Sequence, residues 1–199
     1  MEPGPRFTKT VRSLLRERLL TAAAELTCAD GWANVTMGKV AARVGVSRQT
    51  VYKELGSKPE LAEALMLRET DGFAVGVSQT LSGYPDDAVE GVTAAFQYTL
   101  ESARDNPLLK SVLAGGHGGG DDLLPLLTTQ SDPVLARSVG AVAPMLMRLY
   151  PGVELSETEW EMAVEAFVRL LLSHLVQPAM SIPHATEQMR WVIGRMLRA

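Results

Sequence analysis

The sequence predicts an all-α protein, and three observations support this prediction. Apolar residues recur at helical spacing along almost all of the 199 residues, and no alternating strand pattern of any length competes with it. Glycine, proline, asparagine and aspartate gather at the breaks between the periodic segments. Ala, Leu and Val dominate the hydrophobic residues, whereas aromatic residues make up only 6% of the chain.

Three helices are expected before residue 57. The first covers about residues 10–29 and ends before Gly31, a residue type that is common after helix ends. Two short helices follow, and Thr36 and Ser47 are their expected N-caps, because hydroxyl side chains accept hydrogen bonds from the first helical N–H groups. Gly45 separates the two short helices, at a turn that needs a positive φ.

The longer helices begin at residues that cap or start helices. Ser57 to Glu60 has the spacing of a capping box and opens a helix to about residue 80, and a second capping box begins at Ser156. Residues 115–120, GGHGGG, are expected to form a flexible loop. Further helices are expected over about residues 86–104, from 107 over a shorter stretch, over 131–150, over 156–177 and from 183 to the C-terminus.

The composition argues against a membrane protein and against a disulfide-stabilised protein. No run of about 18 uninterrupted apolar residues is present, so we expect no membrane span. The start, MEPGPRFTKT, lacks the apolar stretch of a secretory signal. The single cysteine, Cys28, cannot build an internal disulfide framework. We therefore expect a cytoplasmic protein.

Charge is distributed unevenly along the chain. The net charge is −4, but residues 1–58 hold ten Lys and Arg against five acids, and the remaining residues hold nine against eighteen. Chance variation could give a smaller difference of this kind. A basic N-terminal part on an acidic body is what a protein needs to present one face to a polyanion.

Residues 40–58, VAARVGVSRQTVYKELGSK, have the pattern of two short helices that cross at a turn. The apolar residues of both helices can point inward together, and the small Ala41 allows a close approach. The second helix then presents polar residues near its N-terminus, as in a helix-turn-helix whose second helix enters the major groove of DNA. The inward-pointing residues are Val40, Val44, Val46, Val51 and Leu55.

The polar residues of this segment are suited to base edges and phosphates. Arg48 can donate two hydrogen bonds to guanine, Gln49 can pair with adenine, and the methyl group of Thr50 can contact that of thymine. Any one of these residues could instead simply face water on a solvated hairpin, but together they favour double-stranded DNA as a partner. The predicted DNA-binding residues are Thr36, Ser47, Arg48, Gln49, Thr50, Tyr52, Lys53 and Lys58.

Residues 10–60 closely resemble the N-terminal domain of TetR-type (TetR/AcrR-like) transcriptional repressors. The family often has an aromatic residue where Leu55 stands and a histidine or another polar residue where Glu54 stands. Leu55 still fills the core, whereas Glu54 leaves the operator sequence open. The resemblance rests on the long first helix and on Gly31-Trp32, Thr36, Val40-Ala41, Gly45-Val46-Ser47, Thr50-Val51-Tyr52 and Ser57-Lys58.

We thus expect a flexible N-terminal arm over residues 1–9 and a three-helix DNA-binding domain with the helix-turn-helix over residues 10–56. A larger helical domain for ligand binding and dimerisation is expected over residues 57–199.

The last two helices are expected to form a homodimer interface. Between about residues 156 and 177, polar residues fall every four positions, and from Met162 on all other positions except His174 are apolar. A helix that is apolar over most of its circumference needs a second burial surface, which a symmetry mate supplies. Burial of both helices in a monomer core is the alternative. The predicted interface residues are Phe167, Leu171, His174, Leu175, Met189, Val192, Ile193 and Met196.

The resemblance also implies a cavity for a small effector in the C-terminal body. Methionine and aromatic residues often line adaptable apolar pockets, although an ordinary core role is the alternative for each of them. The predicted ligand-binding residues are Met66, Phe73, Phe96, Tyr98, Met145, Trp160 and Phe167.

Catalysis is not expected. His117 to Gly120 reads like the HGGG segment of esterases, but no Gly-x-Ser-x-Gly nucleophile turn accompanies it. The three histidines are too far apart to indicate a metal site, and no cofactor is expected. The sequence predicts a dimeric, ligand-responsive transcriptional regulator, in the simplest case a repressor, that a small apolar effector releases from a palindromic operator. The alternatives are a constitutive DNA-binding protein without effector and a small hydrolase.

Overall fold

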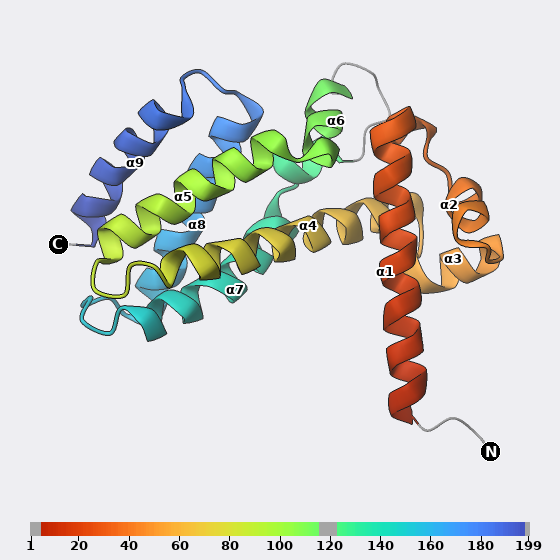
Figure 1. The fold of residues 1–199 in the computed structure, drawn as a ribbon, viewed down its shortest axis with the longest axis horizontal. Coiled ribbons are helices and arrows are strands. Elements are labelled where there is room, and N and C mark those ends of the chain that lie inside the picture. The colour runs from red at the N-terminus through yellow and green to blue at the C-terminus, as the bar shows by residue number, and fades with distance from the viewer. Residues whose placement is uncertain (1–4, 116–122, 198–199) are drawn as a thin grey trace. The chain divides into compact units, whose positions relative to one another are not determined.

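The computed structural model describes residues 5–115 and 123–197. Every regular element in these ranges is helical, which confirms the predicted all-α class (Figure 1). Two short 3₁₀ turns, η1 (Trp32–Asn34) and η2 (Leu124–Leu127), interrupt the series. The helices are α1 (Pro5–Asp30), α2 (Met37–Val44), α3 (Arg48–Leu55), α4 (Lys58–Leu81), α5 (Ala88–Asp105), α6 (Pro107–Gly115), α7 (Asp132–Leu149), α8 (Glu157–Val176) and α9 (Ile182–Met196).

Two compact units make up the described chain. Unit 1 comprises the described residues of Met1–Met66 and Pro107–Leu124, and unit 2 comprises those of Leu67–Asn106 and Pro125–Ala199. Unit 1 therefore contains α1, α2, α3 and α6 together with the start of α4. Unit 2 contains the rest of α4 with α5, α7, α8 and α9.

The helices begin where the capping residues predicted them to begin. The side chain of Thr36 accepts a hydrogen bond from the N–H of Lys39 at 3.1 Å, and Ser47 accepts one from Thr50 at 3.1 Å. These bonds satisfy N–H groups that have no partner within the helix. Gly45 lies between the two helices with a φ of 80°, the left-handed conformation that favours glycine.

Both predicted capping boxes are present. The N–H of Ser57 donates to a carboxylate oxygen of Glu60 at 2.7 Å, and the N–H of Ser156 donates to Glu159 at the same distance. The Ser57 backbone and hydroxyl bonds lower the pKa of Glu60, and the Ser156 hydroxyl and backbone bonds lower the pKa of Glu159. Both carboxylates therefore stay charged, and the caps intact, to lower pH than a free side chain would allow.

The start of α1 differs from the expected start. The helix begins at Pro5, so residues 5–9, which the sequence placed in an N-terminal arm, have helical backbone. The expected start was placed by the spacing of apolar residues, and that pattern begins only near Leu15. It therefore could not locate a helix start at Pro5.

Unit 1 is built around the second half of α1. One face of this helix buries Leu19, Ala23 and Leu26, against which α2 and α3 pack. Helix α6 packs on α1 as well, and the hydroxyl of Ser111 donates to the carbonyl oxygen of Thr27 at 2.9 Å. Helix α1 thus supports α2, α3 and α6.

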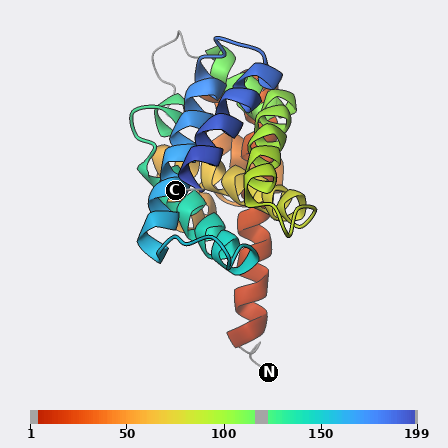
Figure 2. The same ribbon diagram turned by 90° about the vertical axis from the view of Figure 1, so that its left-hand side faces the viewer.

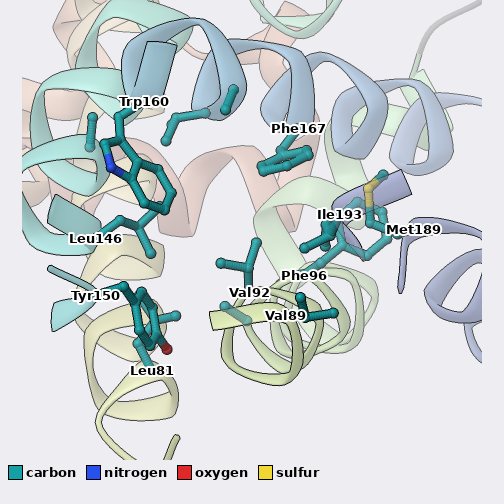
Figure 3. Packing of buried hydrophobic residues seen from close by; sticks show 14 of the residues in the cluster. Leu81, Val89, Val92, Phe96, Leu146, Tyr150, Trp160, Phe167, Met189 and Ile193 are labelled. Atoms are coloured by element: carbon teal, nitrogen blue, oxygen red, sulfur yellow. The ribbon is translucent and has the colours of Figure 1, made fainter. Parts of the chain in front are cut away.

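Unit 2 is a helical bundle with its own core. Helix α7 packs along α8, and α9 packs along α5; Figure 2 looks onto α8 and α9, drawn in two shades of blue. Figure 3 shows the largest residues of the core, where Trp160 and Tyr150 lie on one side and Phe96 and Phe167 on the other. None of the helices in the described ranges combines the length and apolar character that crossing a membrane requires.

Tyr150 is buried against a glycine of α5. Its hydroxyl has no hydrogen-bond partner among the described residues, and a Cβ on Gly91 would overlap it. Burial, with a smaller contribution from the negative charge of Asp87, raises the pKa of Tyr150. The absence of a side chain at Gly91 therefore gives the tyrosine ring its place in the core.

We expect Gly91→Ala to destabilise the protein by about 1–3 kcal/mol, because the added methyl group overpacks the core. Tyr150→Phe removes the overlapping hydroxyl, so the same substitution should cost less in that background. Gly140→Ala is the matched control: this helical glycine is exposed, nothing lies near its Cβ position, and alanine there should stabilise by up to about 1 kcal/mol. Urea denaturation of the four variants measures these differences. An equal loss of unfolding free energy from Gly91→Ala in both backgrounds would show that the added methyl group does not meet the Tyr150 hydroxyl.

Candidate nucleic-acid interface and ligand cavity

Helix α3 presents a polar face because its apolar residues are fixed inside unit 1. Val51 and Leu55 are buried on the inner side of the helix. Ser47 caps its N-terminus. The side chains that remain on the outer side are Arg48, Gln49, Tyr52 and Lys53, all exposed, with the half-buried Thr50 at the edge.

Arg48 and Tyr52 order each other on this outer face. The guanidinium of Arg48 donates to the Tyr52 hydroxyl at 3.1 Å and lies 5.4 Å from the centre of its ring. Contacts of this kind, one helical turn apart, restrict two otherwise mobile side chains. Thr50 is held in a similar way, since its hydroxyl lies 2.9 Å from that of Ser47. Part of the predicted DNA-binding face is thus ordered before any DNA is bound.

Thr36 and Lys58 lie at the starts of α2 and α4 rather than on α3. Thr36 is exposed and caps α2. The ammonium group of Lys58 donates to the carbonyl oxygens of Trp32 and Ala33, at 3.0 and 3.3 Å, and lies 5.1 Å from the centre of the Trp32 ring. Lys58 therefore ties the first turn of α4 to η1. Two of the three N–H groups of its ammonium are used in these bonds, so one remains for a phosphate.

Glu54 points away from the outer face of α3 and is held by α1. Its side chain is only 9% exposed, and the Nε of Arg12 lies 2.7 Å from a carboxylate oxygen. The guanidinium of Arg16 donates to the Glu54 carbonyl oxygen at 2.5 Å. Glu54, the acid next to the predicted DNA-binding residue Lys53, is thus paired with an arginine of the same chain.

Sequence reasoning missed Arg12 and Arg16 as members of this region. A signal was present, since both residues continue the face of α1 that carries Leu19 and Ala23 one to three turns later. Which helix meets that face depends on tertiary packing, which the sequence pattern does not show.

Unit 2 contains an apolar cavity of about 90 Å³ between α4, α5, α7 and α8. Among the described residues that line it, Thr99 is the polar one, and its hydroxyl already donates to the carbonyl oxygen of Ala95 at 2.8 Å. The lining is therefore almost entirely hydrocarbon, and Figure 3 labels five of its residues, Leu81, Val92, Phe96, Leu146 and Phe167. The lining residues are Val77, Leu81, Val92, Ala95, Phe96, Thr99, Val142, Leu146, Val164, Phe167, Val168 and Leu171.

The predicted ligand-binding residues are only partly brought together. Phe96 and Phe167 line the cavity. Trp160 is buried in the same core but does not line the cavity, and Met66 is buried in unit 1. The others are half-buried residues of unit 2 that do not line the cavity either, namely Phe73, Tyr98 and Met145.

The predicted interface residues divide into two groups. Phe167, Met189 and Ile193 are buried within the single chain. The remaining five are half-buried: Leu171, His174, Leu175, Val192 and Met196.

His174 packs edge-to-face on Phe96, with ring centres 6.0 Å apart. Large apolar side chains are nevertheless exposed on both helices, namely Met162 and Leu170 on α8 and Trp191, 66% exposed, on α9. The helical pattern found the two helices but not which of their residues stay uncovered.

The described residues hold no group of three His, Cys, Asp or Glu side chains that could bind a metal ion. The predicted HGGG segment, including His117, lies outside the described residues.

Family models match both parts of the chain. Residues 19–65 match the model described as bacterial regulatory proteins, tetR family, and residues 87–195 match that of the bacterial tetracyclin repressor, C-terminal domain. The HTH-type transcriptional regulator AlkX of Mycobacterium tuberculosis is 33% identical over 173 residues, which cover 86% of this chain and 80% of the relative.

Solved structures share the fold. The TetR-family repressor AlkX from Dietzia sp., implicated in biodegradation of n-alkanes, superposes with a TM-score of 0.76 at 24% identity and covers 91% of this chain and 96% of its own. Thermus thermophilus FadR, solved with lauroyl-CoA, gives a TM-score of 0.64 at 18% identity, with 92% and 94% covered.

These matches extend over the helix-turn-helix and over most of the C-terminal helices, and the proteins they name regulate transcription rather than catalyse reactions. The chain belongs to the TetR family of bacterial DNA-binding transcriptional regulators.

Proposed function

We propose that this protein is a homodimeric repressor that binds a palindromic operator through α3 and is released by a small apolar effector. The observation that carries the proposal is the outer face of α3, where Arg48, Gln49, Tyr52 and Lys53 are exposed beside a buried Val51. Side chains of these types read base edges and hold phosphates. Thr36, Ser47, Thr50 and Lys58 belong to the same proposed contact set, at the helix starts around this face.

The effector is proposed to occupy the apolar cavity of unit 2. The Dietzia repressor is implicated in n-alkane biodegradation, and the Thermus FadR was solved with lauroyl-CoA. Both n-alkanes and the lauroyl group are aliphatic chains, which supports an aliphatic effector for this protein. Helix α4 begins at Lys58 in unit 1 and carries the cavity-lining Val77 and Leu81 in unit 2. A ligand that binds the released state more tightly can therefore shift the DNA-binding equilibrium through one continuous helix.

The dimer is proposed to form through α8 and α9. One recognition helix in one groove makes few contacts, and two-fold symmetry doubles them on a palindromic operator. The exposed Met162, Leu170 and Trp191 give these two helices an apolar surface that a second copy would cover. As a regulator of bacterial transcription the protein would act in the cytoplasm, where the chromosome lies.

Arg48→Ala or Gln49→Ala should weaken operator binding by about 1–3 kcal/mol and relax the preference at particular base pairs. Gln79→Ala, which removes an exposed glutamine from α4, is the matched control and should leave binding unchanged. Fluorescence anisotropy with the operator and its single-base variants measures both effects. An equal loss on every sequence would show that these two side chains do not read bases.

Leu170→Glu combined with Trp191→Glu should yield monomers, because both charges would be buried on dimer formation. Val75→Glu provides the control, since Val75 is 60% exposed on α4 and lies outside the proposed interface. Sedimentation velocity distinguishes the two species. A double variant that stays dimeric would exclude this face as the interface.

Ala95→Leu should fill part of the cavity and prevent release of the operator by a series of straight-chain alcohols, while binding of DNA without the alcohol stays as in the wild type. The matched control is Ala136→Leu at an exposed position of α7. Anisotropy of labelled operator DNA during alcohol titration measures release. If the Ala95→Leu variant released the operator at the same alcohol concentration as the wild type, the effector would bind outside this cavity.

A further inference from the structure

We propose that the first half of α1 is a second DNA-binding element, in which Arg12 and Arg16 contact the phosphates beside the groove that α3 enters and Glu54 positions them. The proposal rests on the proposed role of α3 as the recognition helix. It adds a surface that none of the predicted contact residues includes.

From Thr10 to Arg18 the side chains of α1 are hardly covered by the rest of unit 1. Helix α1 has 26 residues, about 39 Å at 1.5 Å per residue, and its N-terminal half extends past α3 (Figure 1). Between Thr10 and Arg18 every side chain is exposed except the half-buried Leu15. A helical segment of this length with so little burial contributes little to the fold of a single chain.

The face of α1 that forms the core changes from apolar to basic where the helix leaves the core. Arg12, Arg16, Leu19 and Ala23 follow one another at spacings of three or four residues, so they lie on one side of the helix. Leu19 and Ala23 are fully buried. Arg12 and Arg16 instead lie at the end of α3. The arginines therefore point to the side on which α3 lies.

Glu54 fixes these two arginines with two different groups. Its carboxylate pairs with Arg12, and its carbonyl oxygen, one of those left without a helical partner at the end of α3, accepts from Arg16. The side chain of Arg12 remains 64% exposed, and a guanidinium carries five N–H donors. Most of the donors of Arg12 are therefore available to a further acceptor.

Charge and position identify that acceptor as the phosphate backbone of duplex DNA. Arg12 and Arg16 bring two positive charges to the end of α3, against the one negative charge of Glu54. This basic stretch adjoins α3, whose exposed Arg48 and Lys53 have the same sign. A basic surface that continues a base-reading helix meets the phosphates next to the groove, where arginine contacts set orientation and affinity.

The experiment compares Arg12→Gln/Arg16→Gln with Arg18→Gln, which changes the same charge on another side of the same helix. Binding of the full-length protein to a selected operator and to unrelated duplex DNA is measured over a range of salt concentrations, and circular dichroism checks the fold. Each lost phosphate contact should flatten the dependence of log K on log salt by about 0.9. We expect the double variant to lose affinity equally on both DNAs and to show a flatter slope, and Arg18→Gln to behave as the wild type.

Two results would overturn the proposal. In the first, the double variant and Arg18→Gln have the same slope and affinity. In the second, the double variant loses affinity for the selected operator alone at an unchanged slope, so that the arginines act only on the orientation of α3. A wild-type protein that binds no duplex would instead refute the proposed function, which keeps the two failures distinct.

A double-mutant cycle tests the positioning role of Glu54. If Glu54 holds Arg12 in place, Arg12→Gln should change the salt slope less in a Glu54→Gln background than in the wild type. Equal changes in the two backgrounds would mean that Arg12 reaches the phosphates without Glu54, and this part of the proposal would be wrong.

Discussion

Burial of Val40, Val51 and Leu55 in the space between α1, α2 and α3 is the constraint on which the recognition surface depends. A helix has two sides, and once Val51 and Leu55 are fixed inward, Arg48 and Gln49 can only face outward. Gly45 allows this arrangement, because the chain must pass through a left-handed conformation between the two short helices. The side chains that α3 is proposed to present to DNA are therefore fixed by apolar packing on the opposite side of the helix.

Helix α1 combines two physical roles along one face. Its second half buries small and aliphatic residues that hold α2, α3 and α6, and its first half presents arginines beside the end of α3. The acid at Glu54, which disagrees with a DNA-facing helix when read alone, becomes consistent once Arg12 is seen to neutralise it. Unit 2 differs from unit 1 in leaving a small space lined by hydrocarbon, and this lining supports the proposal of an apolar effector.

Local features could be predicted from the sequence, and features that depend on packing could not. The caps at Thr36, Ser47 and Ser156 are formed by residues three apart, so the sequence pattern contains all the information they need. Whether Trp160 lines a cavity or fills the core depends on how α7 and α8 cross, and periodicity does not determine that crossing. The contact between Arg12 and Glu54 joins positions 42 residues apart, beyond the reach of any helical pattern.

The central claim is that two copies of α3 read base edges on the two halves of one operator. Selection of bound sequences from a random duplex pool at low ionic strength tests it most directly. The arrangement predicts enrichment of two inverted half-sites whose centres lie about one helical turn, roughly 10 base pairs, or a multiple of it apart. Folded protein that enriches no sequence, or a single half-site without its inverted copy, would contradict it.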